Sequence, residues 1–328
     1  MNPTTPATLD AATLEKLIAA ASAAPSIHNT QPWRYRLDPE TVTLEVRAAL
    51  DRELRQADPH GRALHLSVGA ALFNIRVATA HFGWEPVVRL LPDDARPDVL
   101  AAVRLAGSAP RPEAHPADLY DAVWRRHSSR FPFNGGLLPD ALCAELVAAA
   151  AAEGTRLRFP EPEENARLLG LTAEAEQRNH TDPERRTESR AWIRPGGVDG
   201  VPPSALGPRD ADARMPVRDF TGPLYGTGPD PEAFEAEPCL AVLSTSGDGA
   251  ADWLRAGQAL ERVLLVATAE RAVASLLHQA LEWHDLRWAL RDAHSGPGHV
   301  QMLIRLGYGP QGPATPRRAV RDVLDGGA

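Results

Sequence analysis

Residues 24–33 read Ala-Pro-Ser-Ile-His-Asn-Thr-Gln-Pro-Trp, and this stretch decides how the chain is interpreted. It follows a run at 14–23 that is typical of a helix and precedes a run at 33–37 that is typical of a strand. The two prolines favour a turn, and Ser26, Asn29 and Gln31 carry hydrogen-bond donors and acceptors. The stretch is compatible with an ordinary helix–strand connection. It is equally compatible with a turn that presents polar groups to the edge of a planar ligand.

A second polar stretch at 125–130 reads Arg-Arg-His-Ser-Ser-Arg. Arg126, Ser128 and Arg130 alternate, so in extended backbone they share one face. Two guanidinium forks beside a hydroxyl suit an anion such as phosphate, because their geometry matches its oxygens. A solvated basic surface is the simpler interpretation of this stretch taken alone.

Composition limits the classes of function. The net charge of the 328 residues is −8, which argues against a nucleic-acid partner because the protein has no net basic field. The two cysteines, Cys143 and Cys239, have neither metal-type spacing nor a disulfide framework, and they fit a reducing cytoplasm. The N-terminus lacks the features of a signal peptide, and no apolar run reaches about 20 residues. We therefore expect a cytoplasmic protein with no membrane partner.

The chain contains an internal repeat. Residues 69–80 and 257–268 match in register at Gly, Ala and Leu, and both predict helices whose small residues allow close approach. The strand-like runs at 34–37 and 156–159 also pair by pattern. The offset between the helices exceeds that between the strands, so the second half must carry an insertion between them.

We place this insertion at about 161–236. The segment is rich in proline and glycine, notably at 194–203, which predicts irregular loop. A long insertion of this kind is a functional lid or a disordered segment. Aromatic and apolar residues favour a packed lid: Trp192, Ile193, Phe220, Tyr225 and Phe234. The predicted fold class is α+β, with two diverged copies of one unit at 1–110 and 111–328.

Three motifs resemble those of the nitroreductase superfamily. They are Ala-Pro-Ser-x-x-Asn-x-Gln-Pro-Trp at 24–33, Arg-x-Ser-x-Arg at 126–130 and Pro-Arg-Arg at 316–318. Ordinary members are homodimers that bind flavin mononucleotide (FMN) at the subunit interface, with the first motif from one subunit and the second from the other. Here each motif occurs once: the first lies in the first half of the chain, and the other two lie in the second half. The resemblance therefore implies a fused pseudo-dimer with one complete site, which could act as a monomer.

Further matches make the chain similar to the Acg family of nitroreductase-like flavoproteins. They lie at 66–74, 279–282, 300–308 and 315–318. One departure is Gly298-His-Val-Gln301, where a proline would be expected before the glutamine.

The resemblance implies FMN as the cofactor and identifies its contacts. Ser26, Asn29 and Gln31 would meet the ring or ribityl chain, and the arginines with Ser128 would hold ribityl and phosphate oxygens. Backbone amides near Ser275 and Leu276 would approach the reactive ring edge. The full set is Pro25, Ser26, Asn29, Gln31, Arg126, Ser128, Arg130, Ser275, Leu276, Arg317 and Arg318. No side chain is assigned as catalytic, because the flavin carries the chemistry.

Two functions remain open. One is an oxidoreductase that passes a hydride or electrons between FMN, NAD(P)H and an unknown small molecule; the other is a flavin-sequestering protein with a lid-occluded site. His28 could be catalytic or only a turn residue. His278 and Glu282 have the spacing of a helical metal pair, but no cysteine accompanies them, so we expect a capping or surface role and no metal.

Overall fold

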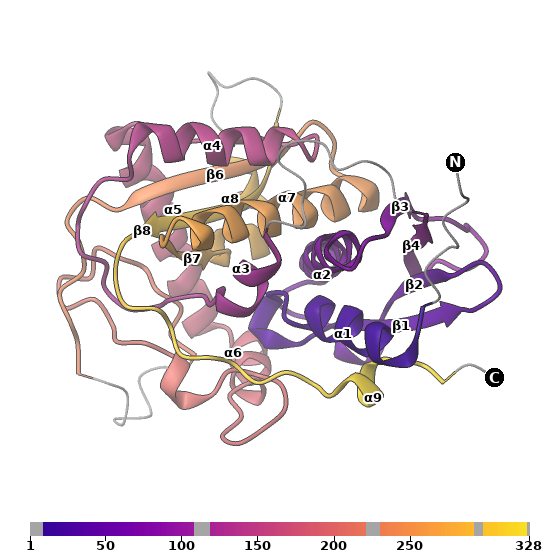
Figure 1. Ribbon diagram of the computed structural model, residues 1–328. Helices are drawn as coiled ribbons and strands as arrows, with labels where there is room; N and C mark the ends of the chain where they lie inside the picture. The colour runs from indigo at the N-terminus through magenta and orange to yellow at the C-terminus, as the bar shows by residue number, and fades with distance from the viewer. Residues whose placement is uncertain (1–8, 108–118, 221–229, 292–297, 327–328) are drawn as a thin grey trace.

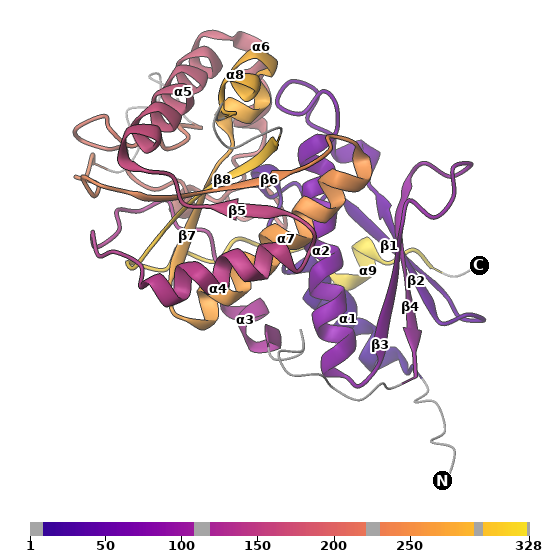
Figure 2. The ribbon, with the colours of Figure 1, turned by 90° about the horizontal axis from the view of Figure 1, so that it is seen from above.

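The computed structural model describes residues 9–107, 119–220, 230–291 and 298–326. Two four-stranded antiparallel sheets lie on either side of a central helical layer (Figures 1 and 2). The first sheet, in the order β1-β2-β4-β3, contains β1 (Trp33–Asp38), β2 (Thr43–Ala48), β3 (Glu85–Leu90) and β4 (Val99–Ala106). The second, in the order β5-β6-β8-β7, contains β5 (Arg156–Arg158), β6 (Cys239–Thr245), β7 (Val273–Leu277) and β8 (His299–Gly307).

The two halves share their topology. Apart from short helices and the insertion, each half consists of an alanine-rich helix, two strands, a long helix and two more strands, in that order. The second strand of each sheet also carries a register shift, between Val46 and Arg47 in β2 and between Leu243 and Ser244 in β6. This agreement supports the internal repeat, while descent from one duplicated unit stays a prediction. The expected boundary at 110/111 lies outside the described residues.

The central layer contains the two long helices of the repeat, α2 (Arg62–His81) and α7 (Ala250–Ala269) (Figure 2). They cross at Gly69 and Gly257. A Cβ atom on Gly257 would lie 2.1 Å from the carbonyl oxygen of Leu66 and 2.8 Å from the Cα of Gly69. Only hydrogen fits there, so the predicted close approach is confirmed. By length and composition α2 could cross a membrane, but 89% of its apolar window is buried inside the protein.

The remaining helices pack beside this central pair or lie at the periphery of the fold. Helix α1 (Ala11–Ser22) is capped by Asp10, whose carboxylate accepts from the Thr13 amide at 2.7 Å, and it buries Leu17 and Ile18. The others are α3 (Tyr120–Arg125), α4 (Asp140–Ala151), α5 (Pro162–Thr181), α6 (Pro183–Ala191), α8 (His284–Ala289) and α9 (Val320–Val323).

The insertion lies between β5 and β6, where the sequence predicts it, but its first part is helical. The prediction of an irregular segment is wrong for residues 162–191, which form α5 and α6. Pro162 and Pro183 occupy the first turns of these helices, where the missing amide costs nothing, and Asp182 caps α6. Proline content therefore does not indicate irregular structure in this part of the insertion, because these prolines begin helices. Tyr225 lies outside the described residues.

The C-terminal segment returns from the second half to the first (Figure 1). After β8 it runs without regular structure to α9, which packs beside α1 and β1. The Asp325 amide donates to the Tyr35 carbonyl at 2.7 Å, and Val323 is buried in the core of the first half. This crossing brings Arg317 to the turn that follows α1.

Candidate functional site

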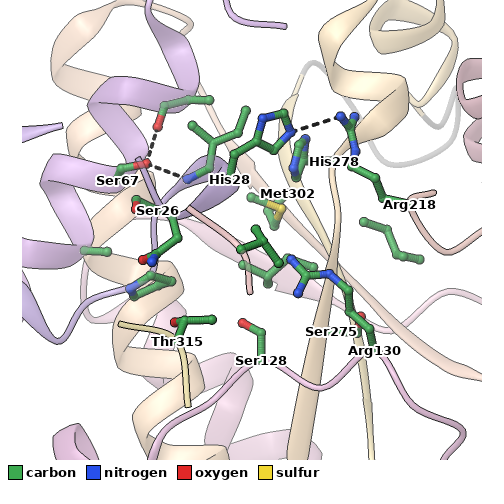
Figure 3. Close-up of a pocket in the computed structure, with 18 of the residues that line it drawn as sticks. Ser26, His28, Ser67, Ser128, Arg130, Arg218, Ser275, His278, Met302 and Thr315 are labelled. Atoms are coloured by element: carbon green, nitrogen blue, oxygen red, sulfur yellow. Dashed lines mark hydrogen bonds between the residues drawn. The ribbon is translucent and has the colours of Figure 1, made fainter. Parts of the chain in front are cut away.

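A pocket lies where the two halves, the insertion and the C-terminal segment meet (Figure 3). It encloses about 1180 Å³ of space, part of which opens to solvent. Its walls are the turn after α1, the start of α2, the segment 126–130, part of the insertion, β7 and the stretch before α9. Pockets of this kind at the junction of structural units are the usual location of small-molecule sites.

The pocket is strongly basic. Five arginines line it: Arg62, Arg126, Arg130, Arg218 and Arg317. Within the described part of the chain, no Asp or Glu lines it. Burial lowers the pKa of Arg62 to about 10, helped by Arg287, and that of Arg130 to about 10, helped by Arg218. Burial and Arg126 lower the pKa of Arg317 to about 9. These guanidinium groups are poorly solvated and lack full compensation, which is what a site for an anionic ligand requires.

The turn after α1 is held in an unusual backbone conformation. His28, Asn29 and Gln31 have φ values of 49°, 54° and 49°, in the left-handed region that non-glycine residues rarely adopt. Hydrogen bonds fix this shape, because the Gln31 amide donates to Ser26 Oγ at 2.9 Å and the Asn29 amide donates to the Ser26 carbonyl at 3.0 Å. Strained turns of this kind cluster at functional sites, and this one presents Pro25 and Ser26 to the pocket.

The Asn29 side chain lines the pocket, but its amide is already engaged by protein groups. Its Nδ2 donates to the carbonyls of Gly200 at 2.8 Å and Pro316 at 3.0 Å. Its Oδ1 accepts from Arg317 at 3.1 Å. Asn29 therefore joins the turn, the insertion and the C-terminal segment, and it orients a pocket arginine.

Two residues of the predicted site lie outside the pocket. Gln31 is fully buried; it donates to the Val198 carbonyl at 3.0 Å and accepts from the Arg318 amide at 2.8 Å. The Arg318 guanidinium turns to the Asp322 carbonyl instead. The structure therefore does not bring Gln31 and Arg318 into the pocket with the other predicted site residues. The left-handed backbone at Gln31 directs its side chain toward the neighbouring segments.

The Arg-x-Ser-x-Arg stretch is extended, as its alternation predicts. Ser128 bridges Ala274 of β7, and Arg126, Ser128 and Arg130 all line the pocket. Arg126 and Arg317 donate to the same carbonyl, that of Ala23, at 3.1 and 3.0 Å. The structure thus brings together two arginines that are far apart in the sequence, and Ser275 and Leu276 of β7 line the same pocket.

A polar network occupies the other end of the pocket (Figure 3). Arg218 donates to Glu282 and lies 3.0 Å from His28 Nε2, while His278 Nδ1 is 2.6 Å from Glu282. Burial, with Arg218, lowers the pKa of His28 well below its usual value, and burial also lowers that of His278. Burial opposes ionisation of Glu282, but Arg218 and His278 outweigh it and hold its pKa far below the usual range.

The surface or capping role expected for His278 and Glu282 is therefore wrong. The segment Gln279–Glu282 is a short 3-10 helix after β7. His278 precedes it without a side-chain capping bond, and the side chains of His278 and Glu282 are only 15% and 2% exposed. The ligand atoms of His28, His278 and Glu282 lie within 4.8 Å of one another. Arg218 already places a cation against two of these three residues, so a metal ion would compete with it.

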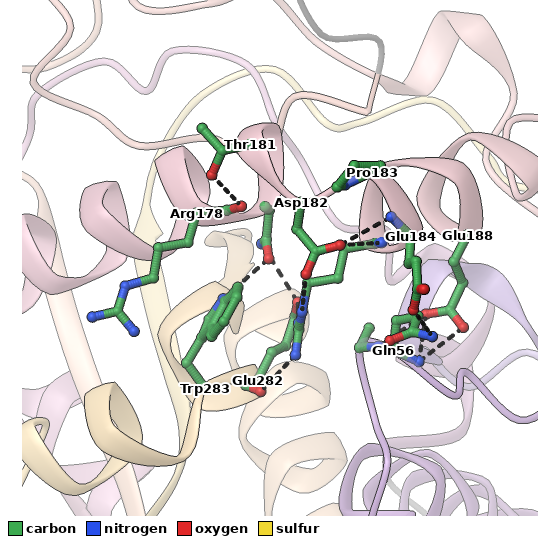
Figure 4. A network of polar contacts seen from close by, with 12 residues as sticks. Gln56, Arg178, Thr181, Asp182, Pro183, Glu184, Glu188, Glu282 and Trp283 are labelled. Carbon is green, nitrogen blue, oxygen red and sulfur yellow. Dashed lines mark hydrogen bonds and ion pairs between the residues drawn. The ribbon is translucent and has the colours of Figure 1, made fainter.

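The insertion forms one wall of the pocket through Val201, Val217, Arg218 and Phe220. The Phe220 ring is 5.2 Å from that of His28 and 5.5 Å from the Arg130 guanidinium. Further out, α5 and α6 attach the insertion to both halves (Figure 4). Glu188 accepts from the Gln56 amide at 3.0 Å, and Trp283 donates to Asn179 at 3.1 Å.

Sequence reasoning missed several pocket residues, among them the polar side chains of Arg62, Arg218 and Thr315. Arg62 is the first residue of α2, and Arg218 belongs to the insertion. Arginine carries nearly all the positive charge of this chain, so a single arginine is no signal. Thr315 directly precedes the Pro-Arg-Arg motif, and its hydroxyl accepts from Arg317 at 2.6 Å. Only proximity to that motif could have indicated it.

Comparison with known proteins agrees with these observations. A Mycobacterium tuberculosis protein named "Putative NAD(P)H nitroreductase" is 35% identical over 322 residues, which is 96% of this chain and 92% of its own length. The protein named "Putative NAD(P)H nitroreductase acg" from the same species is 29% identical over 319 residues, with 95% of each chain covered. No family model matches the chain.

The chain also resembles solved structures. A solved structure described as a "putative nitroreductase" from Anabaena variabilis covers 91% of this chain and 88% of its own at 11% identity, with a TM-score of 0.46. A nitroreductase with bound FMN from Desulfitobacterium hafniense covers 64% and 98% at 14% identity, with a TM-score of 0.40. The mycobacterial relatives match nearly the whole chain, including both halves and the insertion. The chain therefore belongs to the nitroreductase-like family that contains these relatives, Acg among them.

Proposed function

We propose that this protein is an FMN-dependent oxidoreductase of the nitroreductase type. The basic pocket carries the proposal, because a flavin phosphate would supply the anion that its arginines lack. Arg317 retains a buried Nε without a hydrogen-bond partner among the described residues, and the Arg126 Nε, equally without a hydrogen bond there, lies 3.4 Å from the Glu261 carboxylate. Buried donors of this kind are costly unless a ligand satisfies them. The residues present thus fit a phosphate-bearing cofactor.

The proposed roles follow from the positions of the side chains. Arg126 and Arg317 would hold the phosphate, with Ser128 and Thr315 beside them. Pro25, Ser26, Arg130, Ser275 and Leu276 would border the remainder of the cofactor. Asn29, Gln31 and Arg318 would act as supports, since protein groups already use their polar atoms. The terminal nitrogens of Arg317 also bond to protein groups, but its buried Nε has no partner among the described residues and its charge is not fully balanced. FMN, when bound, supplies a ring system that accepts and donates a hydride or single electrons.

Both halves would contribute to one site within one chain. Ser26 and Asn29 come from the first half, and Arg126 and Ser275 from the second. This division supports a pair of diverged copies that works as a monomer. The free cysteines, Cys143 and Cys239, fit a reducing compartment such as the cytoplasm.

The electron donor would be NAD(P)H, as the names of the mycobacterial relatives suggest. The insertion would act as a lid that limits access to the cofactor, since Phe220 and Arg218 belong to the pocket wall. The flavin-sequestering alternative gains no support from these relatives, which are named for an NAD(P)H-dependent activity.

A flavin titration tests the cofactor. Purified protein is titrated with FMN and the flavin fluorescence is followed; we expect one FMN per chain. Anaerobic addition of NADPH or NADH should then bleach the flavin absorbance. No FMN binding after reconstitution would refute the proposal, and binding without reduction by either nicotinamide would favour the sequestering alternative.

The lid is tested by truncating its pocket-facing ring. Phe220→Ala should leave FMN bound but speed its reduction by dithionite, because a wall of the pocket is opened. Trp288→Ala is the matched control, since Trp288 is 64% exposed on α8 and lies outside the pocket. Equal reduction rates for the Phe220 variant and the parent would exclude a shielding role for this residue.

A further inference from the structure

One buried carboxylate stands behind the two proposed phosphate ligands. Glu261 lies on α7 and is fully buried, and its carboxylate is 3.4 Å from Arg126 Nε. It does not line the pocket, whereas Arg126 and Arg317 do. Neither of its oxygens has a hydrogen-bond partner among the described residues. A buried carboxylate with no hydrogen bond is an expensive arrangement unless the group is protonated or closely paired.

A proton on Glu261 would also provide a hydrogen-bond donor for a second buried acceptor that lacks one, the side-chain oxygen of Asn74. Asn74 of α2 lies beside the Glu261 carboxylate and uses its Nδ2 to donate to the Ala20 carbonyl at 3.1 Å. Its Oδ1 has no partner within the described chain. When Glu261 is ionised, its two oxygens and Asn74 Oδ1 are all acceptors, and none of them has a hydrogen-bond partner within the described chain. A protonated Glu261 has one O–H, which can be donated to Asn74 Oδ1.

The charges around Glu261 show what decides its state. Arg126 and Arg317 are the cations that face it, and His127 is close to both of them. Burial raises the pKa of Glu261 to about 7, against the opposing charges of Arg126 and Arg317. Near neutral pH the site therefore alternates between one and two net positive charges.

We propose that Glu261 makes this arginine pair selective for a phosphate ester and couples the binding of the ester to the uptake of one proton. The inference rests on the proposed function, since the ester in question is that of FMN. The phosphate dianion satisfies both arginines, so they no longer stabilise the ionised carboxylate. Glu261 then takes a proton from solvent and becomes neutral, and no other bond changes. By thermodynamic linkage, the protonated carboxylate in turn favours the phosphate.

The sign and size of the effect follow from this linkage. Below pH 7 Glu261 is protonated before the ligand arrives and binding needs no proton. Above pH 7 each binding event must draw one, so the FMN Kd should rise about fivefold from pH 7 to pH 8. Other groups should contribute little in this window. Burial lowers the pKa of His127 below its usual value, the pKa of Arg317 lies at about 9, and a phosphate ester with a second pKa of about 6 is already mostly dianionic.

The experiment compares FMN with riboflavin, which lacks the phosphate, by calorimetry between pH 7 and pH 8 in MOPS and in Tris. Heats in buffers of different ionisation enthalpy report the protons taken up. We expect about half a proton for FMN at pH 7, rising toward one at pH 8. Riboflavin should bind more weakly, with no proton uptake and no pH dependence. This comparison uses the parent protein alone and does not depend on any variant folding.

Two variants then identify the group. In Glu261→Gln the amide can donate to Asn74 as the protonated acid would, so FMN should bind with an affinity that no longer changes with pH. Glu270→Gln, at an exposed position at the end of the same helix, should keep the pH dependence of the parent. FMN binding that is independent of pH, the same dependence for riboflavin, or a persistent dependence in Glu261→Gln would each overturn the inference while leaving FMN as the cofactor. Absence of FMN binding at every pH would instead remove the proposed function and this inference with it.

Discussion

Removing the Asn29 side chain tests the structure at the point where three segments meet. Asn29→Ala deletes the bonds to Gly200, Pro316 and Arg317, at 2.8, 3.0 and 3.1 Å. Each bond contributes about 0.5–1.5 kcal/mol, so their joint loss should lower the free energy of unfolding by roughly 2–4 kcal/mol. Alanine also tolerates the φ of 54° poorly, which adds about 1 kcal/mol.

Asn29→Gly separates these two contributions. It removes the same hydrogen bonds but adopts the left-handed backbone freely, so it should be about 1 kcal/mol more stable than Asn29→Ala. Urea denaturation of both variants, without flavin, measures the difference. Equal stabilities for the two variants would contradict the strain argument, and parent-like stability of Asn29→Gly would contradict the argument from hydrogen bonds.

The same variants distinguish a supporting residue from a direct ligand. Because protein atoms already occupy the Asn29 amide, its loss should weaken FMN binding less than the loss of a phosphate-facing arginine. A fluorescence titration of FMN against Asn29→Gly and Arg126→Gln gives the two affinities. If Asn29→Gly kept its stability and lost more affinity than Arg126→Gln, Asn29 would have to be a direct flavin contact, and the structural role assigned to it would be withdrawn.

Three further changes address the site and the fold. Arg126→Gln should weaken FMN binding by about 1.5–3 kcal/mol, or roughly 10- to 150-fold in Kd, and leave riboflavin binding nearly unchanged, because only the phosphate contact is charge-assisted. Arg125→Gln, at the exposed neighbouring position, is the control. Equal losses of FMN and riboflavin affinity in Arg126→Gln would argue against a phosphate contact. Gly257→Ala should destabilise the protein by about 1–3 kcal/mol or more, since its Cβ would meet backbone at 2.1 Å. Gly170→Ala on the exposed side of α5, with nothing within 4 Å, should instead gain about 0.5–1 kcal/mol; thermal denaturation of the pair measures both, and a harmless Gly257→Ala would contradict the helix crossing. Glu282→Gln should cost about 3–5 kcal/mol at pH 7, because a buried arginine loses its counter-charge. Because the pKa of Glu282 is lowered in the folded protein, this contribution is complete above about pH 4.5 and is lost as the pH falls toward the folded-state pKa. The stabilities of the parent and the variant should therefore converge in acid. A constant difference in urea denaturation from pH 7 to pH 3 would show that ionisation of Glu282 is not the cause.

The sequence by itself determined the elements and their repetition. Periodicity and small residues located α1, β1, α2 and α7, because hydrophobic spacing and close-packing glycines act over a few helical turns. The offset between the repeats placed the insertion in the second half. The alternation at 126–130 brought Arg126, Ser128 and Arg130 to one pocket face, since side-chain direction in extended backbone depends only on neighbouring residues.

The tertiary structure alone decided which polar groups meet and which are already used. Gln31 and Arg318 belong to two of the motifs, but their polar groups bond to other protein groups. The Gln31 side chain bonds to the Val198 carbonyl and the Arg318 amide, and the Arg318 guanidinium donates to the Asp322 carbonyl. The local sequence does not specify these partners. Arg218 and Glu282 meet across 64 residues of chain, and Glu261 comes to lie behind Arg126 because α7 crosses α2 at two glycines. Burial changes the charge state of such groups, and burial is a property of the assembled core, so the chemistry of this pocket follows from packing that residue spacing does not encode.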